Sequence, residues 1–231
     1  MTTTVGVSLK MYFGHRRARD WFAEVAERAG GHPAVVSGAV ELFVVPTYLQ
    51  VLPAVAAFAG TRVRIGAQDV AGYETGAYTG EVSAAELAEV GVSLAEIGHA
   101  ERRRLFGETD RDTAAKATEA LRHGVTPLLC ADSADQLRAG LTGVPAGPVI
   151  AAYEPVWAIG AAEPASAGHI GEVASAMRDV LADRPGSRVI YGGSAGPGLL
   201  TALGTTVDGV FLGRFAHDPA ALVEVLDEAA S

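Results

Sequence analysis

The sequence predicts an α/β fold, a (β/α)8 barrel with eight parallel strands, and three observations support that prediction. Short apolar runs alternate with segments of helical periodicity, a pattern typical of a parallel sheet that is buried on both faces. Eight such strand–helix pairs fit within the 231 residues, a length at which this barrel is common. No linker rich in Gly, Ser and Pro divides the chain, so we expect residues 1–231 to form a single domain.

The predicted strands are short runs dominated by Val, Ile, Leu and Ala. In chain order they are Val5–Leu9, Leu42–Pro46, Val63–Ala67, Val92–Ile97, Val125–Cys130, Val149–Tyr153, Val189–Tyr191 and Gly209–Leu212. Helical stretches lie between them, of which four are representative: Arg16–Arg28, Asp112–His123, Ile170–Asp183 and Pro219–Ala229. In the last stretch, Leu222, Val225 and Leu226 share one stripe, which predicts a helix packed against the sheet.

An open, doubly wound sheet of the Rossmann type is the alternative arrangement of the same elements. That fold carries the fingerprint G-x-G-x-x-G directly after its first strand. Here the first predicted strand runs into Ser8-Leu9-Lys10-Met11 instead. The missing fingerprint favours the closed barrel.

The composition is that of an ordinary globular protein with an acidic balance. Apolar residues make up 49% and charged residues 19% of the chain, and 18 basic against 27 acidic side chains leave a net charge of −9. The longest cationic run is Arg102–Arg104. Because polyanions bind through many clustered cations, we expect neither nucleic acid nor a membrane surface as a partner.

The cysteine content and the first residues predict a cytoplasmic protein. Cys130 is the single cysteine, which excludes an intramolecular disulfide and leaves no pair of cysteines for zinc. The start Met1–Thr4 lacks the charge and the apolar run of a signal peptide. No stretch approaches the ~20 apolar residues of a transmembrane helix.

Polar residues that directly follow an apolar run are the candidates for chemistry, because the active site of a (β/α)8 barrel lies where its strands end. Lys10, His99, Glu154 and the turn Gly192–Ser194 occupy such positions after strands 1, 4, 6 and 7. They are far apart in the sequence, but a closed barrel brings them together.

Lys10 is one of two lysines, and every other basic residue is Arg. A compact ammonium suits a phosphate or a developing oxyanion. The alternative is a solvated lysine at the start of a loop.

His99 lies in the segment Gly98–Arg103, where a short helix is expected to begin. The positive end of that helix would favour a neutral imidazole, which donates a hydrogen bond to a substrate oxygen and exchanges protons with it. The alternative is a structural histidine bonded to the backbone. We expect Glu101 and Arg102–Arg104 to form salt bridges that support Lys10 and the strand ends.

Glu154 stands between an apolar run and Pro155, which ends the strand. A carboxylate held at such a turn is a candidate general base. The following segment, Pro155–Gly160, is unusually apolar for a loop, which suggests a lid that excludes water. An ordinary packed turn is the alternative.

Two glycine-rich turns follow the last two predicted strands, one at Gly192–Ser194 and one at Gly213-Arg214. Loops at these two positions often bind phosphate in such barrels through backbone N–H groups. The pair therefore suggests a phosphate site.

Several segments taken together resemble triosephosphate isomerase over nearly the whole chain. The most specific are the run Tyr-Glu-Pro-Val-Trp-Ala-Ile-Gly at 153–160 and the segment Gly-His-Ala-Glu-Arg-Arg at 98–103. The remaining ones are Lys10-Met11, Gly66–Asp69, Gly76–Glu81, Phe106–Thr109 and Tyr191–Ser194. The resemblance implies the TIM barrel fold and an isomerase that interconverts dihydroxyacetone phosphate and glyceraldehyde 3-phosphate.

The same resemblance implies roles for individual residues. Glu154 would be the base that moves a proton between adjacent substrate carbons through an enediolate, His99 the neutral electrophile, and Lys10 the cation that stabilises the anion. The groups around the phosphate would be Gly160, Ser194, Gly213 and Arg214.

The loop 72–81 resembles the family's dimer loop, in which Thr79 would enter the neighbouring subunit near its Lys10. A homodimer is therefore implied. The mechanism needs no metal and no organic cofactor, since a placed base, oriented donors and exclusion of water lower the barrier.

The sequence departs from the family pattern around the substrate. Ser8 stands where the family has Asn, Leu9 where it has Trp, Ala100 where it has Ser, and Arg214 where it has a second Gly. The lid tip is Ala-Ala-Glu-Pro at 161–164 in place of Thr-Gly-Lys-Thr, and Asp132-Ser133 replaces Gly-Glu.

Three features resemble a branch of the family that isomerises erythrulose phosphates in tetritol catabolism: Ser8 before Leu9-Lys10, the lid end Pro164-Ala165-Ser166, and Gly213-Arg214 after strand 8. A four-carbon sugar phosphate is therefore the alternative substrate. Triose phosphate is placed slightly ahead on the match over the whole chain. Two other hypotheses are a phosphate-binding barrel without activity and a sugar-phosphate barrel enzyme of the kind found in tryptophan biosynthesis. Retention of Lys10, His99 and Glu154 argues against the former, and the lid segment argues against the latter.

Overall fold

The computed structural model describes residues 2–161 and 163–231. Within them, eight strands pair in chain order, each parallel to the next, and β1 closes the ring by pairing with β8. The strands are β1 (Thr3–Ser8), β2 (Val40–Val45), β3 (Arg64–Ala67), β4 (Leu94–Ile97), β5 (Thr126–Ala131), β6 (Ile150–Tyr153), β7 (Arg188–Tyr191) and β8 (Gly209–Leu212). The predicted barrel is confirmed, and the open sheet is wrong.

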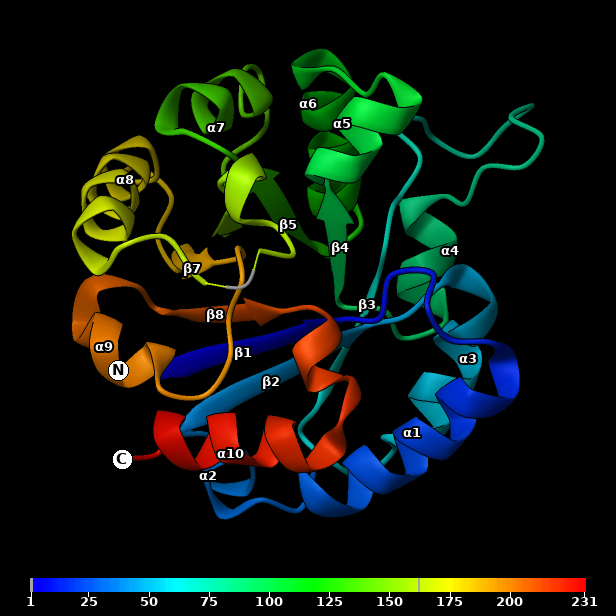
Figure 1. The fold of residues 1–231 in the computed structure, drawn as a ribbon. Coiled ribbons are helices and arrows are strands. Elements are labelled where there is room, and N and C mark those ends of the chain that lie inside the picture. The colour runs from blue at the N-terminus through cyan, green and yellow to red at the C-terminus, as the bar shows by residue number, and fades with distance from the viewer. Residues whose placement is uncertain (1, 162) are drawn as a thin grey trace.

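Helices surround the strands on the outside of the ring (Figure 1). They are α1 (His15–Arg28), α2 (Pro33–Ser37), α3 (Tyr48–Ala57), α4 (Ala84–Glu89), α5 (Ala100–Phe106), α6 (Asp110–Arg122), α7 (Ala134–Gly140), α8 (Ala167–Val180), α9 (Leu199–Leu203) and α10 (Pro219–Ala229), with 3-10 turns η1 (Val156–Ala158), η2 (Gly204–Thr206) and η3 (Arg214–His217). No helix in the described part of the chain is both long and apolar enough to cross a membrane.

Capping residues set the helix boundaries that apolar periodicity alone misplaces. The side chain of Thr109 accepts from the backbone N–H of Asp112, and the Asp112 carboxylate accepts from the N–H of Thr109, so α6 begins two residues before the predicted start. At α8 the side chain of Ser166 accepts from the backbone N–H of His169, so this helix begins three residues before the predicted start. The predicted helix Pro219–Ala229 has the observed bounds.

The inside of the barrel is filled by every second residue of the strands, as the pleat requires. This inner cluster is apolar and comprises Phe43, Val45, Leu94, Leu128, Cys130, Ile150, Ala152, Ile190 and Phe211. Gly6 belongs to the same layer, where a Cβ atom would lie 2.1 Å from Cζ of Phe43, so only glycine fits. Two residues further along the strands, the inward positions are Ser8, Glu96 and Glu154, which places these polar groups at the upper end of the barrel interior.

The opposite end of the barrel is closed by ion pairs. The carboxylate of Glu41 binds Arg64 at 2.6 Å and Arg188 at 2.9 Å. Burial alone would raise the pKa of Glu41, but the two guanidinium groups hold it below its usual value. A hollow of about 420 Å³ at this end is lined by the same side chains. We assign this end a structural role, since barrel chemistry is located at the other end of the strands.

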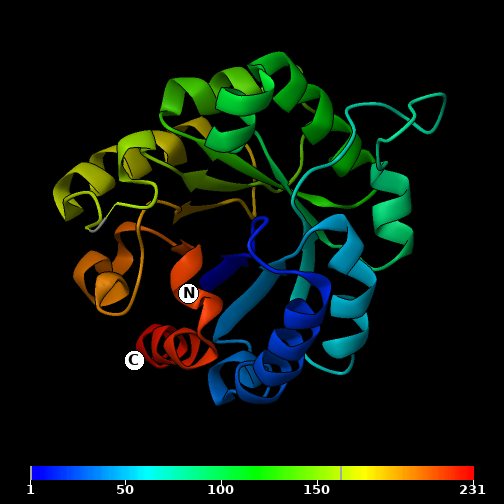
Figure 2. The same ribbon diagram turned by 45° about the vertical axis from the view of Figure 1, so that its right-hand side comes forward.

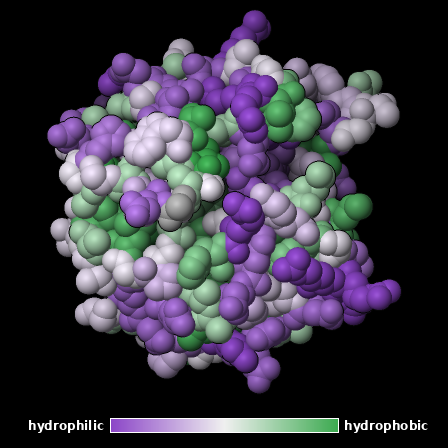
Figure 3. All heavy atoms as spheres, viewed as in Figure 1, coloured by the Kyte–Doolittle hydropathy of each residue, from purple (hydrophilic) through white to green (hydrophobic). Residues whose placement is uncertain are grey.

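A long loop between β3 and α4 projects from the body of the molecule in both ribbon views (Figures 1 and 2). Its base is closed by a hydrogen bond from the N–H of Ala71 to the carbonyl of Val82. Tyr73 and Tyr78 stack within it at a centroid distance of 4.5 Å. On the face drawn in Figure 3, hydrophilic and hydrophobic side chains are interspersed.

Candidate active site

One pocket of about 660 Å³ lies at the carboxyl ends of the strands. It receives side chains or backbone from the segments after β1, β4, β6, β7 and β8, as expected for this barrel. Every candidate residue singled out above contributes to its lining except Thr79. These are Ser8, Lys10, His99, Glu101, Glu154, Gly160, Ser194, Gly213 and Arg214.

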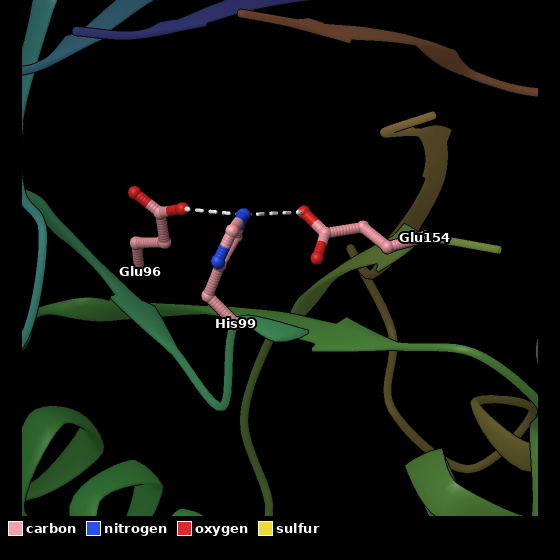
Figure 4. A group of neighbouring side chains, drawn as sticks. All are labelled: Glu96, His99 and Glu154. Atoms are coloured by element: carbon pink, nitrogen blue, oxygen red, sulfur yellow. Dashed lines mark ion pairs between the residues drawn. The ribbon is translucent and has the colours of Figure 1, made fainter. Parts of the chain in front are cut away.

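His99 directs Nε2 into the pocket. It is the N-cap of α5, and its Nδ1 accepts the backbone N–H of Glu101 at 3.1 Å. A nitrogen that accepts a hydrogen bond carries no proton, so the proton of the neutral imidazole lies on Nε2. Nε2 lies 3.6 Å from Oε1 of Glu154 and 3.8 Å from Oε1 of Glu96, between the two carboxyl groups (Figure 4).

Glu154 is 2% exposed and is held by its backbone, whose N–H donates to the carbonyl of Ala131 at 2.8 Å. Among the residues that the structure describes, its Oε2 finds no hydrogen-bond partner. A buried carboxylate oxygen without a partner is costly in free energy and is available to a substrate. Gly192 keeps this space open, since a Cβ atom there would lie 2.9 Å from Cγ of Glu154.

Lys10 adopts a left-handed backbone with φ of 45°, the one such non-glycine residue in the described chain. Gln68 supports this conformation by donating to the Lys10 carbonyl at 3.0 Å. The ammonium binds Glu101 at 2.7 Å. Burial alone would lower the pKa of Lys10, but the hydrogen bond and charge of Glu101 and the nearby carboxylates raise it above its usual value. Lys10 is therefore a fixed positive charge at the pocket.

Two of the three arginines after His99 form salt bridges, as expected, whereas Arg104 forms none among the described residues. Arg102 binds Asp69 at 2.8 Å and Glu108 at 3.1 Å. Arg103 binds Asp110 at 2.6 Å and donates to the carbonyl of Gly98. These contacts join α5 to the neighbouring loops and keep the His99 turn in place.

The lid is fastened to the end of β7 by two residues. The N–H of Ala165 donates to the hydroxyl of Tyr191 at 3.0 Å. The hydroxyl of Ser194 donates to the carbonyl of Ala161 at 2.9 Å, and its N–H donates to the carbonyl of Ala158 at 3.0 Å. Ser194 was expected to donate its backbone N–H to phosphate. In this conformation it does not, because that N–H already donates to a carbonyl of the lid.

Only some residues of the predicted lid line the pocket. Ile159, Gly160 and Ala161 line the pocket, whereas the Trp157 side chain is 65% exposed and does not. The tip expected at 161–164 includes Ala162, which lies outside the described residues. The part of the lid that lines the pocket is therefore residues 159–161 and not its tryptophan.

Arg214 is directed toward the pocket and the lid. Its guanidinium carbon lies 5.9 Å from the centroid of the Tyr12 ring. A Cβ atom at Gly160 would lie 3.6 Å from Nη2 of Arg214, so the side chain extends from η3 to the lid. This position adds one positive charge at the pocket entrance, beside the turns expected to bind phosphate.

Thr79 is exposed on the projecting loop and does not contribute to the pocket of its own chain. An ion pair between Glu74 of the loop and Arg122 of α6 connects the loop to the barrel. Any role of Thr79 in a site must therefore be played in another molecule.

Glu96 was not among the expected site residues. The run Val92–Ile97 is predicted as a strand because it is apolar on average, although it contains this carboxyl group three residues before His99. A charge inside an otherwise buried strand is the signal that identifies it. Its Oε2 accepts the hydroxyl of Ser8 at 3.0 Å, so this hydroxyl is already bonded within the protein.

The fold also assembles a group that the sequence did not indicate. Oxygen and nitrogen atoms of Glu96, His99 and Glu154 lie within 4.8 Å of one another and have the chemistry of metal ligands. That the mechanism needs no metal stays a prediction. The ammonium of Lys10, which acts on both carboxylates, supplies positive charge at this place.

The sequence is similar to known isomerases whose family has this barrel fold. The family model described as triosephosphate isomerase matches residues 3–229. An L-erythrulose-1-phosphate isomerase from Pectobacterium atrosepticum is 47% identical, covering 98% of this chain and 95% of that protein. A triosephosphate isomerase from Symbiobacterium thermophilum is 35% identical over 99% and 97%, and one from Thermus thermophilus is 39% identical over 81% and 82%.

Proposed function

Because this chain belongs to the triosephosphate isomerase family, we propose that it isomerises a four-carbon ketose phosphate through an enediolate. Residue patterns alone place triose phosphate slightly ahead. The erythrulose-phosphate isomerase relative, however, shares more of the sequence than the two triosephosphate isomerases named with it. That identity is the observation that carries the choice of substrate, and we place the four-carbon sugar first.

The base in this proposal is Glu154. In the isomerisation of a ketose phosphate, a proton leaves the hydroxyl-bearing carbon and returns to the former carbonyl carbon. A carboxylate whose Oε2 has no protein partner is available to take that proton. The backbone bond to Ala131 and the stiff Pro155 fix its position, so little reorganisation is required during the reaction.

The enediolate oxygens in this proposal face His99 and Lys10. Nε2 carries the only proton of a neutral imidazole here and donates to a substrate oxygen. The ammonium of Lys10 stabilises the negative charge that develops on the oxygens. No metal or organic cofactor is needed for these steps.

The phosphate in this proposal lies between the lid and the turns after β7 and β8. Gly160 and Gly213 approach it with their backbones, and Arg214 adds a cation at the entrance. Ser194 joins them only if its amide is released from Ala158.

Two observations beyond sequence identity favour a substrate longer than a triose phosphate. A four-carbon ketose phosphate carries one more hydroxymethyl group on the reacting carbons. Ser8 is shorter than the Asn that the family resemblance leads us to expect, which leaves room beside the reacting carbons. The polar pair of Ser8 and Glu96 gives that region hydrogen-bonding groups. Triose phosphate remains the second candidate, because Lys10, His99 and Glu154 serve either substrate.

A homodimer in the cytoplasm is part of the proposal. The projecting loop exposes Thr79 together with the stacked Tyr73 and Tyr78, and Met11 beside Lys10 is 90% exposed. Exposed apolar side chains of this kind are typical of subunit contacts. The single Cys130 agrees with a reducing compartment.

A substrate panel tests the proposed function. Purified protein is assayed with L-erythrulose 1-phosphate and with glyceraldehyde 3-phosphate, and kcat/KM is compared. We expect a higher kcat/KM for the four-carbon sugar. A higher value for the triose phosphate would reverse the order of the two candidates, and turnover of neither would contradict the isomerase proposal for both.

A further inference from the structure

Ser8 is a polar residue of the pocket to which the reaction steps above assign no role. It ends β1 at an inward position, is 2% exposed and lines the pocket. Its backbone is fixed in the barrel, because Ser8 lies opposite Val45 of β2 and the N–H of Leu9 donates to the Val45 carbonyl at 3.1 Å. The side chain therefore borders the pocket from a rigid element.

The hydroxyl proton of Ser8 is used within the protein. It is donated to Oε2 of Glu96 at 3.0 Å, in a bond between two buried side chains. A serine hydroxyl has one proton and two lone pairs, so Oγ has no second proton to donate and still has acceptor capacity. Toward the pocket, Ser8 is therefore an acceptor.

Glu96 fixes this direction. It is the one charged residue of β4, and all four residues of that strand are buried. A buried carboxyl group is unfavourable unless its oxygens find partners. Among the residues that the structure describes, Ser8 is the hydrogen-bond donor to this group. A Ser8 hydroxyl that turned its proton toward the pocket would leave Oε2 of Glu96 without that donor.

Ser8 lies next to the place of the reacting carbons. The carboxyl group that accepts its proton has its other oxygen, Oε1, 3.8 Å from Nε2 of His99, the nitrogen proposed to face the substrate oxygens. Figure 4 shows Glu96 on one side of this imidazole and Glu154 on the other. The groups proposed to bind phosphate belong to the lid and to the turn after β8, whereas Ser8 is a strand residue. A substrate whose phosphate lies among those loops directs its other end toward Ser8.

We propose that Ser8 is a specificity-determining residue whose Oγ accepts a hydrogen bond from the hydroxymethyl group of a four-carbon ketose phosphate. Glu96 is a positioning residue in this proposal, since it accepts the proton of Ser8 and leaves the lone pairs of Oγ to the substrate. The proposal rests on the proposed isomerase function and names the contact that selects its substrate. A triose phosphate has a hydrogen atom in place of the hydroxymethyl group and cannot form this bond.

The test compares two compounds that differ in one hydroxyl group. They are L-erythrulose 1-phosphate and its 4-deoxy analogue, in which a methyl group replaces the hydroxymethyl group and nearly preserves its size. A site that binds a substrate hydroxyl discriminates against the analogue that lacks it. For the wild type we expect kcat/KM to be about tenfold or more higher for the hydroxylated compound. A ratio near one would overturn the proposal.

Ser8→Ala removes the acceptor. We expect kcat/KM for L-erythrulose 1-phosphate to fall about tenfold and kcat/KM for the deoxy analogue to change by less than about twofold, so that their ratio approaches one. A purely structural role of Ser8 would lower both values equally, and that result would overturn the proposal.

Glu96→Leu tests whether Glu96 acts through Ser8. Without the carboxyl group the Ser8 hydroxyl is free to rotate, so we expect the ratio to fall about twofold or more. The combination with S8A should give the same ratio as S8A alone, because both changes affect one contact. A wild-type ratio in E96L, or a different ratio in the double variant, would overturn the positioning role. Burial raises the pKa of Glu96 to about 7, so the assays are run at about pH 8, where the ionised group only accepts.

Thr4→Val is the matched control. Thr4 is a buried hydroxyl residue of the same strand, but its Oγ1 accepts from Arg188 at 2.6 Å at the opposite end of the barrel. It should leave the ratio unchanged. A fall in T4V equal to that in S8A would overturn the assignment to Ser8. Thermal unfolding of each variant verifies that the fold is retained.

The failure of the inference and the failure of the proposed function are distinguishable. Turnover of L-erythrulose 1-phosphate with a wild-type ratio near one would remove the role of Ser8 and leave the function intact. If the wild type turns over neither sugar phosphate, the function fails, and calorimetric titration with the same two compounds still tests Ser8. Tighter binding of the hydroxylated compound by the wild type, with equal affinities in S8A, would support the contact. Equal affinities in the wild type would overturn it.

Discussion

At the scale of single residues, the site depends on a carboxylate that is buried and has one oxygen without a hydrogen-bond partner. Glu154 is 2% exposed, and its Oε2 finds no partner within the described chain. Its backbone is fixed and Gly192 leaves room for it. This arrangement costs stability and provides a base that is in place before the substrate arrives.

Glu154→Gln should therefore separate activity from stability. Glutamine retains the shape but does not accept a proton, so we expect turnover to fall by about 10²–10⁴-fold. The thermal unfolding midpoint should remain the same or rise, since a buried charge is removed. Steady-state kinetics and a melting curve measure both effects. Wild-type turnover in this variant would remove Glu154 from the role of base.

At the scale of elements, the lid is controlled by hydrogen bonds to the end of β7. The hydroxyl of Tyr191 accepts the N–H of Ala165 within the protein interior. Tyr191→Phe removes this acceptor, and one hydrogen bond contributes about 0.5–1.5 kcal/mol. We expect kcat/KM to fall roughly 2- to 10-fold, since the closed lid becomes less populated.

Tyr153→Phe is the matched control for the lid prediction. Tyr153 is also a buried strand tyrosine, but its hydroxyl pairs with His169 on α8 at 2.9 Å. Its loss should affect kcat/KM less than Y191F does. Equal losses in the two variants would show that the fastening of the lid has no special role.

The elements were predictable from the sequence to the extent that burial alone decides them. Apolar runs located all eight strands, because parallel strands are buried on both faces. Helix starts were less well predicted, since the cap of α6 at Thr109 is a local side-chain contact. The convergence of Lys10, His99 and Glu154 on one pocket followed from their strand-end positions.

The rest of the site depends on contacts that spacing does not encode. Glu96 was overlooked because its strand is apolar on average, and its contact with Ser8 joins residues 88 positions apart. The amide of Ser194 is occupied by a lid carbonyl, which depends on the conformation of that loop. The direction of Arg214 depends on how η3 leaves the barrel.

At the scale of the whole molecule, we propose that the projecting loop completes the site of a second copy. Thr79 is exposed and far from any role in its own pocket. Thr79→Asp introduces a charge that an apolar contact would have to desolvate. We expect the wild type to sediment at twice the mass of the chain, and T79D to dissociate at low concentration and lose activity.

Val36→Asp serves as the control for that experiment. Val36 is 57% exposed on α2, away from the loop and the pocket. It should leave both sedimentation and activity unchanged. A wild-type chain that is monomeric and fully active would contradict the dimer proposal.

Exchange with solvent tests the central claim most directly, because an enediolate allows the transferred proton to be replaced by deuterium. L-erythrulose 1-phosphate is incubated with the wild-type protein in D2O and followed by NMR. We predict formation of the ketose phosphate whose carbonyl lies one carbon further from the phosphate, with deuterium on the carbon that received the proton. A substrate that stays unchanged and fully protonated at high protein concentration would contradict the account.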